Sequence, residues 1–267
     1  WLEFGGIKIQ PSEFGKVVVI VGVAAFFAAV ERVDLKRLIG GLAIFALPVA
    51  LIYIQNDLGT ILVYAAIAGG MVLVTGVAPR HLAVVFLALV ALIGIGLVSD
   101  QLQEYQLARL TSFLDENPQA GQAAEARWNV EQAQIAIGNG GLTGQGLFQG
   151  SQTRTDRVPA QETDFIFSVV AEELGFVGAG TLLALFALLL VRIWRIAHLA
   201  GDRFGLFICV GVFSMLLFHI FESVGMNLGL MPVTGIPLPF ISYGGSSIVT
   251  MFAAVGLVLS VNMRRFS

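Results

Sequence analysis

Long apolar runs, separated by short polar breaks, occupy most of the chain. A helix needs about 20 apolar residues to cross a bilayer, and several runs are of this order. The candidate spans are residues 14–31, 38–55, 60–78, 81–98, 165–194, 205–228 and 244–262. The pattern therefore predicts an all-α polytopic membrane protein with these segments as its seven transmembrane helices.

One polar segment interrupts this pattern. Residues 99–163 form a Gly-rich insert between two apolar runs. It is far longer than a helix connection requires, and long loops of this kind are usually functional or disordered. The insert ends at Asp164, an acid at the point where the chain re-enters the membrane. Chemistry at a membrane surface is the first function that this arrangement suggests.

The composition agrees with a membrane protein. Apolar residues make up 57% of the chain and charged residues 12%, with a mean hydropathy of +0.85, whereas soluble domains carry about 25% charged residues. The net charge of −3 gives no reason to expect nucleic acid. A single cysteine, Cys209, excludes both a disulfide framework and a cysteine metal cluster.

The basic residues of the short loops predict the orientation, because such loops are cytoplasmic. They all fall on one side when the spans alternate: Arg32, Lys36, Arg37, Arg80, Arg192, Arg195, Arg203, Arg264 and Arg265. The C-terminus is therefore expected in the cytoplasm and the insert outside. Trp1 would then also lie outside, and because the chain opens without Met or a signal peptide, we expect an N-terminal part to precede it.

Ionisable residues within or at the edge of membrane spans are functional candidates, because a bilayer penalises them. The set is Glu13 with Lys16, Asp57, Asp164, Glu172 with Glu173, and Glu222 with His219. For Asp164 two interpretations stay open and are compatible. It could cap the following helix, where the helix dipole also favours an acid, or it could be a general base that takes a proton from an acceptor hydroxyl.

The other acids also have structural interpretations. Asp57 lies in a tight turn between two spans and could cap the second one. Pro11 suits a first helical turn, with Ser12 as its cap, and Glu13 can pair with Lys16 or form an outer site for an anionic headgroup with it. For one acid of the Glu172-Glu173 pair, an internal ion pair is expected.

Glycine and arginine in the insert raise the question of phosphate binding. The run Gly138–Gly146 could cradle an anion with its backbone amides, although it matches no nucleotide-binding pattern. Arg109 and Arg127 could hold a pyrophosphate, although solvated loop charges are the simpler interpretation. Further along, the prolines of residues 237–239 and the glycines that follow predict non-helical backbone near membrane depth.

Taken together, the motifs resemble those of the SEDS proteins, and among these the RodA branch most. The similarity covers essentially the whole chain and rests on motifs in the family's order: Gln10–Glu13, Gln55–Thr60, Tyr105–Arg109, Ala136–Gly141, Thr163–Phe167, Glu172–Gly175 and Pro237–Ser246. The RodA branch is indicated by Gly140–Thr153 and Met231–Pro239. Leu107 departs from the family pattern. The family has ten spans, so the resemblance implies a single SEDS domain over residues 1–267 that lacks its N-terminal helices.

The resemblance implies an inverting peptidoglycan glycosyltransferase, which polymerises lipid II at the outer face of the cytoplasmic membrane during cell elongation. Asp164 would be its essential acid. Candidate substrate-binding residues are Trp1, Glu13, Lys16, Asp57, Arg109, Ser242 and Tyr243. No cofactor is certain, but a divalent cation such as Mg²⁺ or Mn²⁺ could neutralise the leaving pyrophosphate. Expected partners are a class B penicillin-binding protein, other elongation-complex membrane proteins and membrane lipid, with no nucleic acid.

Two alternatives stay open. A lipid II transporter, or flippase, would use charges spread through the membrane, which Glu13, Asp57, Glu172 and Glu222 could supply. A scaffold for the penicillin-binding protein would need only apolar helix faces. The enzyme interpretation instead places the essential chemistry at the outer boundary, at Asp164 and the insert.

Overall fold

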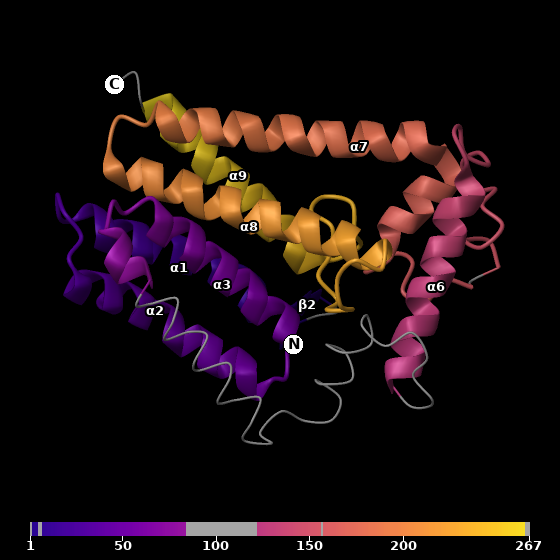
Figure 1. The fold of residues 1–267 in the computed structure, drawn as a ribbon, viewed down its shortest axis with the longest axis horizontal. Coiled ribbons are helices and arrows are strands. Elements are labelled where there is room, and N and C mark those ends of the chain that lie inside the picture. The colour runs from indigo at the N-terminus through magenta and orange to yellow at the C-terminus, as the bar shows by residue number, and fades with distance from the viewer. Residues whose placement is uncertain (1, 5–6, 84–121, 156, 265–267) are drawn as a thin grey trace. The chain divides into compact units, whose positions relative to one another are not determined.

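The computed structural model describes residues 2–4, 7–83, 122–155 and 157–264 (Figure 1). Its elements, in chain order, are β1 (Leu2–Phe4), β2 (Ile7–Ile9), α1 (Pro11–Ala28), α2 (Leu35–Ile54), α3 (Leu58–Leu73), α6 (Gln122–Gly140), α7 (Ile166–His198), α8 (Arg203–Asn227) and α9 (Gly245–Arg264). Apart from the short antiparallel hairpin β1–β2, which the hydrophobic pattern did not predict, the described elements are helices. The predicted helical membrane fold is confirmed.

Five helices among the described residues are long and apolar enough to cross a membrane: α1, α2, α7, α8 and α9. The predicted span 60–78 is shorter, because α3 has 16 residues and the chain turns at Gly76, where φ is 75°. The predicted span 81–98 begins in a described helical turn at residues 79–83 and otherwise lies outside the described residues. The insert is more regular than expected, since α6 occupies part of it.

The chain divides into two compact units. The first draws on residues 1–101, 190–218 and 245–267, and the second on residues 102–189 and 219–244. In the first unit, α1 packs against α2, α3 and α9, and α2 packs against α3. Glycines let these helices approach closely: a Cβ on Gly41 would meet the Phe27 ring at 2.3 Å, and one on Gly211 would meet Ile20 at 2.7 Å. Such small-residue contacts are typical of helix packing in membranes.

Arginines of the predicted cytoplasmic loops stabilise the end of α1. Arg37 donates from Nε to the Phe26 carbonyl at 3.0 Å, and its guanidinium lies 3.7 Å from the centre of the Phe26 ring. Arg203 donates to the carbonyls of Val30 and Glu31. Because the last carbonyls of a helix have no partner within it, these side chains satisfy groups that the α1 end and the following turn leave open.

The second unit contains a break in α7. At Gly175 the backbone leaves the helical region, with φ of 68° and ψ of −168°, so the predicted continuous span 165–194 is interrupted. In an unbroken helix, the amides of residues 176 and 177 would bond the carbonyls of residues 172 and 173. The break separates these groups, and each needs a new partner.

The Gly-rich loop after α6 supplies those partners. Gln145 and Gly146 donate their amides to the Glu172 and Glu173 carbonyls, both at 3.0 Å. In return, the amides of Phe176 and Val177 donate to carbonyls of the loop, those of Gly141 at 2.9 Å and Leu142 at 3.1 Å. The loop therefore repairs the broken helix by backbone pairing, which is how membrane proteins tolerate interrupted helices.

Replacement of Gly175 by alanine should destabilise the protein, because the methyl group would lie 2.2 Å from the Gly144 nitrogen in a left-handed backbone. Left-handed strain and overpacking each cost about 1–3 kcal/mol, so a clear fall of the melting temperature in detergent is expected. Gly180→Ala is the matched control, since a Cβ there meets nothing within 4 Å. Equal melting temperatures for the two variants would contradict the pairing of loop and broken helix.

Candidate functional site

Asp164 lies in a tight turn directly before α7. The amides of Thr163, Asp164 and Phe165 all donate to the Ala160 carbonyl, at 3.1, 3.0 and 3.2 Å. Phe165 is buried and Asp164 is partly buried. The turn thus anchors its main chain on one carbonyl and presents the acid at the start of the helix.

The side chain of Asn227, the last residue of α8, fixes this turn. Its Nδ2 donates to the Asp164 carbonyl at 3.1 Å and to the Ser223 carbonyl at 2.8 Å. Its Oδ1 accepts the Ser168 amide, an early amide of α7, at 3.0 Å. Asn227 is fully buried. Its amide nitrogen donates and its amide oxygen accepts, so the side chain joins the end of α8 to the start of α7.

This geometry changes the capping interpretation of Asp164. The helix begins at Ile166, so Phe165 stands between Asp164 and the first helical residue. The Ser168 amide, which a helix cap normally serves, donates to the Asn227 side chain and also to the Phe165 carbonyl at 3.1 Å. At Ser168 the side-chain cap therefore comes from Asn227, at the end of a distant helix.

The segment after α8 supports the same turn from another direction. Ser242 donates from Oγ to the Thr163 carbonyl at 2.5 Å and accepts the Leu238 amide at 2.8 Å. The Tyr243 amide donates to the Glu162 carbonyl at 2.8 Å. The hydroxyl of Ser242 is thus occupied by the scaffold, whereas the Tyr243 side chain is exposed. Residues 232–239 are non-helical, as the prolines predicted.

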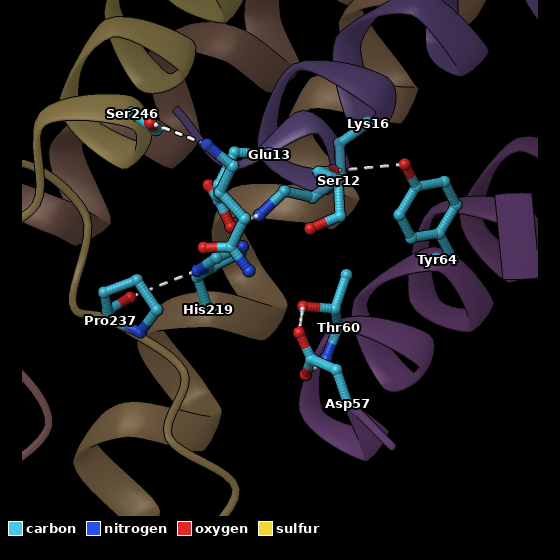
Figure 2. A network of polar contacts seen from close by, with 10 residues as sticks. Ser12, Glu13, Lys16, Asp57, Thr60, Tyr64, His219, Pro237 and Ser246 are labelled. Carbon is cyan, nitrogen blue, oxygen red and sulfur yellow. Dashed lines mark hydrogen bonds and ion pairs between the residues drawn. The ribbon is translucent and has the colours of Figure 1, made fainter. Parts of the chain in front are cut away.

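Gly235 brings this segment against the acid itself. A Cβ at Gly235 would lie 3.4 Å from Oδ2 of Asp164, and the backbone there has a φ of 72°. The segment is in turn bonded to α8. The Glu222 carboxylate accepts from the Thr234 hydroxyl at 2.9 Å. Figure 2 shows the second bond, in which His219 Nδ1 donates to the Pro237 carbonyl at 3.1 Å. Buried Glu222 and His219 therefore hold the segment that contacts Asp164.

Glu172 also has a structural partner set, but not the expected ion pair. Its carboxylate accepts the amides of Gln152 and Thr153 at 2.8 and 3.0 Å, and the Thr153 hydroxyl at 2.6 Å. The Ser151 hydroxyl lies 3.2 Å from it. The ion pair expected for one acid of the Glu172-Glu173 pair is not formed at Glu172: hydroxyls and backbone amides of one loop hold this fully buried acid.

The structure does not support a phosphate cradle at Gly138–Gly146, because three of its backbone amides already have partners. The Gln145 and Gly146 amides donate to α7 carbonyls, and the Gly144 amide donates to the Gly140 carbonyl at 2.8 Å. The glycines are explained by space: a Cβ on Gly140 would lie 1.9 Å from the Ala171 carbonyl oxygen. The loop is rich in glycine because α7 passes directly against it.

The first unit holds a second polar group (Figure 2). Lys16 Nζ lies 2.7 Å from Glu13 Oε1, and both side chains are buried, so the predicted pair forms. Tyr64 donates to the Ser12 carbonyl at 3.2 Å. Ser12 itself does not cap α1, since the cap residue is Gln10, which offers no side-chain bond. The Gln10 amide donates instead to Ser246 Oγ at 3.1 Å.

Asp57 behaves as the turn and cap residue that the sequence suggested. It is the N-cap of α3, and it accepts the Thr60 amide at 3.0 Å and the Thr60 hydroxyl at 2.7 Å. Its place in substrate binding stays a prediction, as it does for Glu13 and Lys16. These residues belong to the first unit, and Asp164, Ser242 and Tyr243 to the second.

Two candidates, Trp1 and Arg109, lie outside the described residues. Arg127 pairs with Glu131 one helical turn away at 2.9 Å, and both are partly exposed, as expected for charges on a solvated helix face. Within the described ranges, no three His, Cys, Asp or Glu side chains gather in a way that could hold a metal ion, so a bound cation stays a prediction.

Comparison with known proteins decides the family. The family model for cell cycle proteins of the FtsW, RodA and SpoVE type matches residues 1–266. The chain belongs to the FtsW/RodA/SpoVE family. The resemblance inferred from the motifs is thereby confirmed, and with it a multi-pass membrane protein.

Individual relatives agree. The chain is 37% identical over 266 residues to the peptidoglycan glycosyltransferase MrdB of Escherichia coli K12, covering 99% of this chain and 71% of MrdB. It is 40% identical to the stage V sporulation protein E of Bacillus subtilis, covering 98% and 70%. A solved chain from a peptidoglycan synthase complex that coordinates polymerization and crosslinking has a TM-score of 0.76 at 32% identity, covering 100% of this chain and 74% of that one. The RodA crystal structure of Thermus thermophilus has a TM-score of 0.65 at 30% identity, covering 100% and 70%.

Sequence reasoning missed the residues that hold Asp164. Asn227 lies 63 positions away along the chain, and one asparagine at the end of an apolar run carries no signal of its own. Gly235 reads as a turn glycine until the acid beside it is known. One clue was available: a polar side chain near membrane depth requires a partner, and Asn227 is such a residue.

Asn227→Asp should destabilise the second unit, because a carboxylate cannot donate to the Asp164 and Ser223 carbonyls. Each buried group left without a partner costs about 1–3 kcal/mol, so a marked fall of the melting temperature in detergent is expected. Gln134→Glu makes the same amide-to-acid change at an exposed residue that donates to the Leu228 carbonyl at 2.8 Å, and it should change little. A silent Asn227→Asp would refute the bridging role.

Proposed function

We propose that Asp164 is the general base of a peptidoglycan glycosyltransferase that joins lipid II units into glycan strands. The enzyme class comes with the family: the chain is a peptidoglycan glycosyltransferase of the RodA type. The assignment of Asp164, the substrate and the course of the reaction are the parts that we propose.

The proposed reaction asks one task of the acid. The donor sugar carries an undecaprenyl pyrophosphate, which is already a good leaving group, so no strong acid catalyst is needed. The acceptor is a sugar hydroxyl. The Asp164 carboxylate takes its proton as the hydroxyl oxygen attacks the anomeric carbon and the pyrophosphate departs. A single displacement of this kind inverts the configuration at that carbon.

The observation that supports Asp164 most is the way its main chain is held. Asn227 donates to the Asp164 carbonyl, and Ser242 donates to the preceding carbonyl, that of Thr163. The amides of the turn donate to the Ala160 carbonyl. A general base works when its carboxylate stays within hydrogen-bond reach of the proton that it removes. Support of the backbone on both sides provides such a fixed position.

Departure of the pyrophosphate requires positive charge nearby. Arg109, Lys16 or a divalent cation such as Mg²⁺ or Mn²⁺ would supply it. Lys16 already neutralises Glu13 at 2.7 Å, so it serves this role only if substrate competes for that pair.

A transpeptidase of the penicillin-binding class is the proposed partner. The structural neighbour from a complex of polymerization and crosslinking supports it, since glycan strands made by one enzyme are the substrate of the other. The other elongation-complex membrane proteins expected from the family resemblance stay a prediction.

Replacement of Asp164 by asparagine or alanine should abolish glycan polymerisation from purified lipid II by the full-length protein with its partner present. Loss of a general base typically costs about 10²–10⁴-fold in rate. Glu162→Gln is the matched control, because Glu162 is an exposed acid two residues away that contributes its carbonyl to Tyr243. Activity of the Asp164 variants close to the control would move the search for the base to Asp57 and Glu13.

The same preparation separates the transporter alternative. Wild-type protein that makes no polymer but moves fluorescent lipid II across vesicle membranes would favour the flippase and overturn the enzyme mechanism. If wild type makes polymer and Asp164→Asn does not, with unchanged folding and partner binding, catalysis by this protein is supported. A scaffold role would then exist in addition to catalysis.

We also propose that the C-terminus lies in the cytoplasm and the insert outside, from the bias of Lys and Arg toward the short loops. In intact cells, a cysteine at exposed Arg157 should react with a membrane-impermeant maleimide, whereas one at exposed Arg32 should react only after lysis. The opposite labelling pattern would reverse the orientation and remove Asp164 from the outer face.

A further inference from the structure

An exposed apolar tip stands out on the part of the insert that repairs α7. Leu142, Leu147 and Phe148 are exposed, Phe148 at 83% and Leu142 at 73%. Single exposed apolar residues are ordinary, but a contiguous apolar patch marks an interaction surface. The three residues lie within one short loop of the Gly-rich insert.

The tip is a hydrogen-bonded turn. The Gln149 amide donates to the Gly146 carbonyl at 3.1 Å, which places Leu147 and Phe148 at the turn's centre. The Gln145 side chain closes the loop from within, because it accepts the Ser151 amide at 2.9 Å and donates to the Asn139 carbonyl at 3.2 Å. The ends of the loop are thus fixed, and the apolar residues project from a defined frame.

Phe148 adopts a conformation that its type disfavours. Its φ is 60°, a value at which a turn normally carries Gly or Asn. For a bulky residue such a backbone is a true outlier, and outliers of this kind support a functional hypothesis. A phenylalanine that is both strained and exposed gains nothing from the described protein core, so its stabilising contact lies elsewhere.

The position of the tip along α7 indicates what that contact is. Residues 176–191 contain no charged side chain, and Arg192 follows. Since a span takes about 20 residues, the bilayer edge at this end of α7 falls near Gly175. The loop bonds α7 at this level, through the Glu172, Glu173, Phe176 and Val177 backbone. The tip therefore lies at the membrane surface.

The apolar surface also continues onto the helix. Phe176 and Val177 are 72% and 62% exposed, and α7 as a whole leaves most of its apolar window uncovered by protein. We take this uncovered face to meet lipid. The carbonyls of Gly141 and Leu142 accept the amides of those two residues, so the loop is an extension of the lipid-facing side of α7.

We propose that Leu142, Leu147 and Phe148 insert into the bilayer leaflet at the Asp164 end of α7, the outer leaflet in the proposed orientation. Apolar side chains on interfacial segments typically reach about 5–10 Å below the headgroups. The inserted tip anchors the loop that completes α7, and through it the short helical stretch between Asp164 and Gly175. This inference does not depend on the catalytic assignment of Asp164.

The test uses the full-length protein in proteoliposomes without lipid II or partner. Phe148→Cys and, as matched control, Arg154→Cys are labelled with an environment-sensitive fluorophore in a background without other accessible cysteines. Arg154 is exposed in the same ordered insert, and Cys209 is buried. Lipids with a spin label on the acyl chain and soluble iodide serve as opposing quenchers.

The label at Phe148 should be quenched by the acyl-chain spin label clearly more than the control, as for a group within the interfacial layer, and the control should be quenched by iodide. Leu147→Cys repeats the test if Phe148→Cys does not fold. Iodide quenching at both tip positions equal to the control would overturn the proposal. Shielding that arises only when the transpeptidase is added would also overturn it and make the tip a protein interface.

Discussion

A backbone amide or carbonyl that is left without a partner in a membrane costs several kcal/mol, and this constraint organises the described structure. Where α7 breaks at Gly175, four backbone groups lose their helical partners, and a loop from the insert pairs with each of them. Where α7 begins, the Asn227 side chain bonds the Ser168 amide. Where α1 ends, Arg37 and Arg203 bond the carbonyls.

The polar residues of the second unit divide according to this constraint. Glu172, Asn227 and Ser242 each spend their side chains on backbone groups of another segment. They are polar residues near the membrane, which alone would make them functional candidates, yet their contacts are structural. The buried polar side chains of this unit thus fix the position of non-helical backbone.

The sequence was sufficient for the fold class and most membrane spans, because these depend on local pattern. Hydrophobic runs report spans directly, and the Asp57 cap and the Glu13–Lys16 pair are contacts between residues three apart. Contacts between distant segments were not predictable. The break at Gly175 depends on the conformation of a loop some thirty residues earlier in the chain. Neither the loop sequence nor the helix sequence alone indicates that the two pair. The partners of Glu172 were not predictable for the same reason, since residues 151–153 look like ordinary polar loop residues.

The support of Asp164 comes from contacts that sequence could not suggest. Asn227 bonds the Asp164 carbonyl and also bonds the Ser168 amide, and Ser242 and Ala160 hold the flanking main chain. The position of the acid is thereby set by other residues. The helix that carries the acid is fixed at one end by the Asn227 side chain and, beyond Glu172 and Glu173, by the loop whose apolar tip we propose to insert into the bilayer. Precision at the acid thus rests on contacts from α8, the segment after it and the insert, and α7 alone would not provide it.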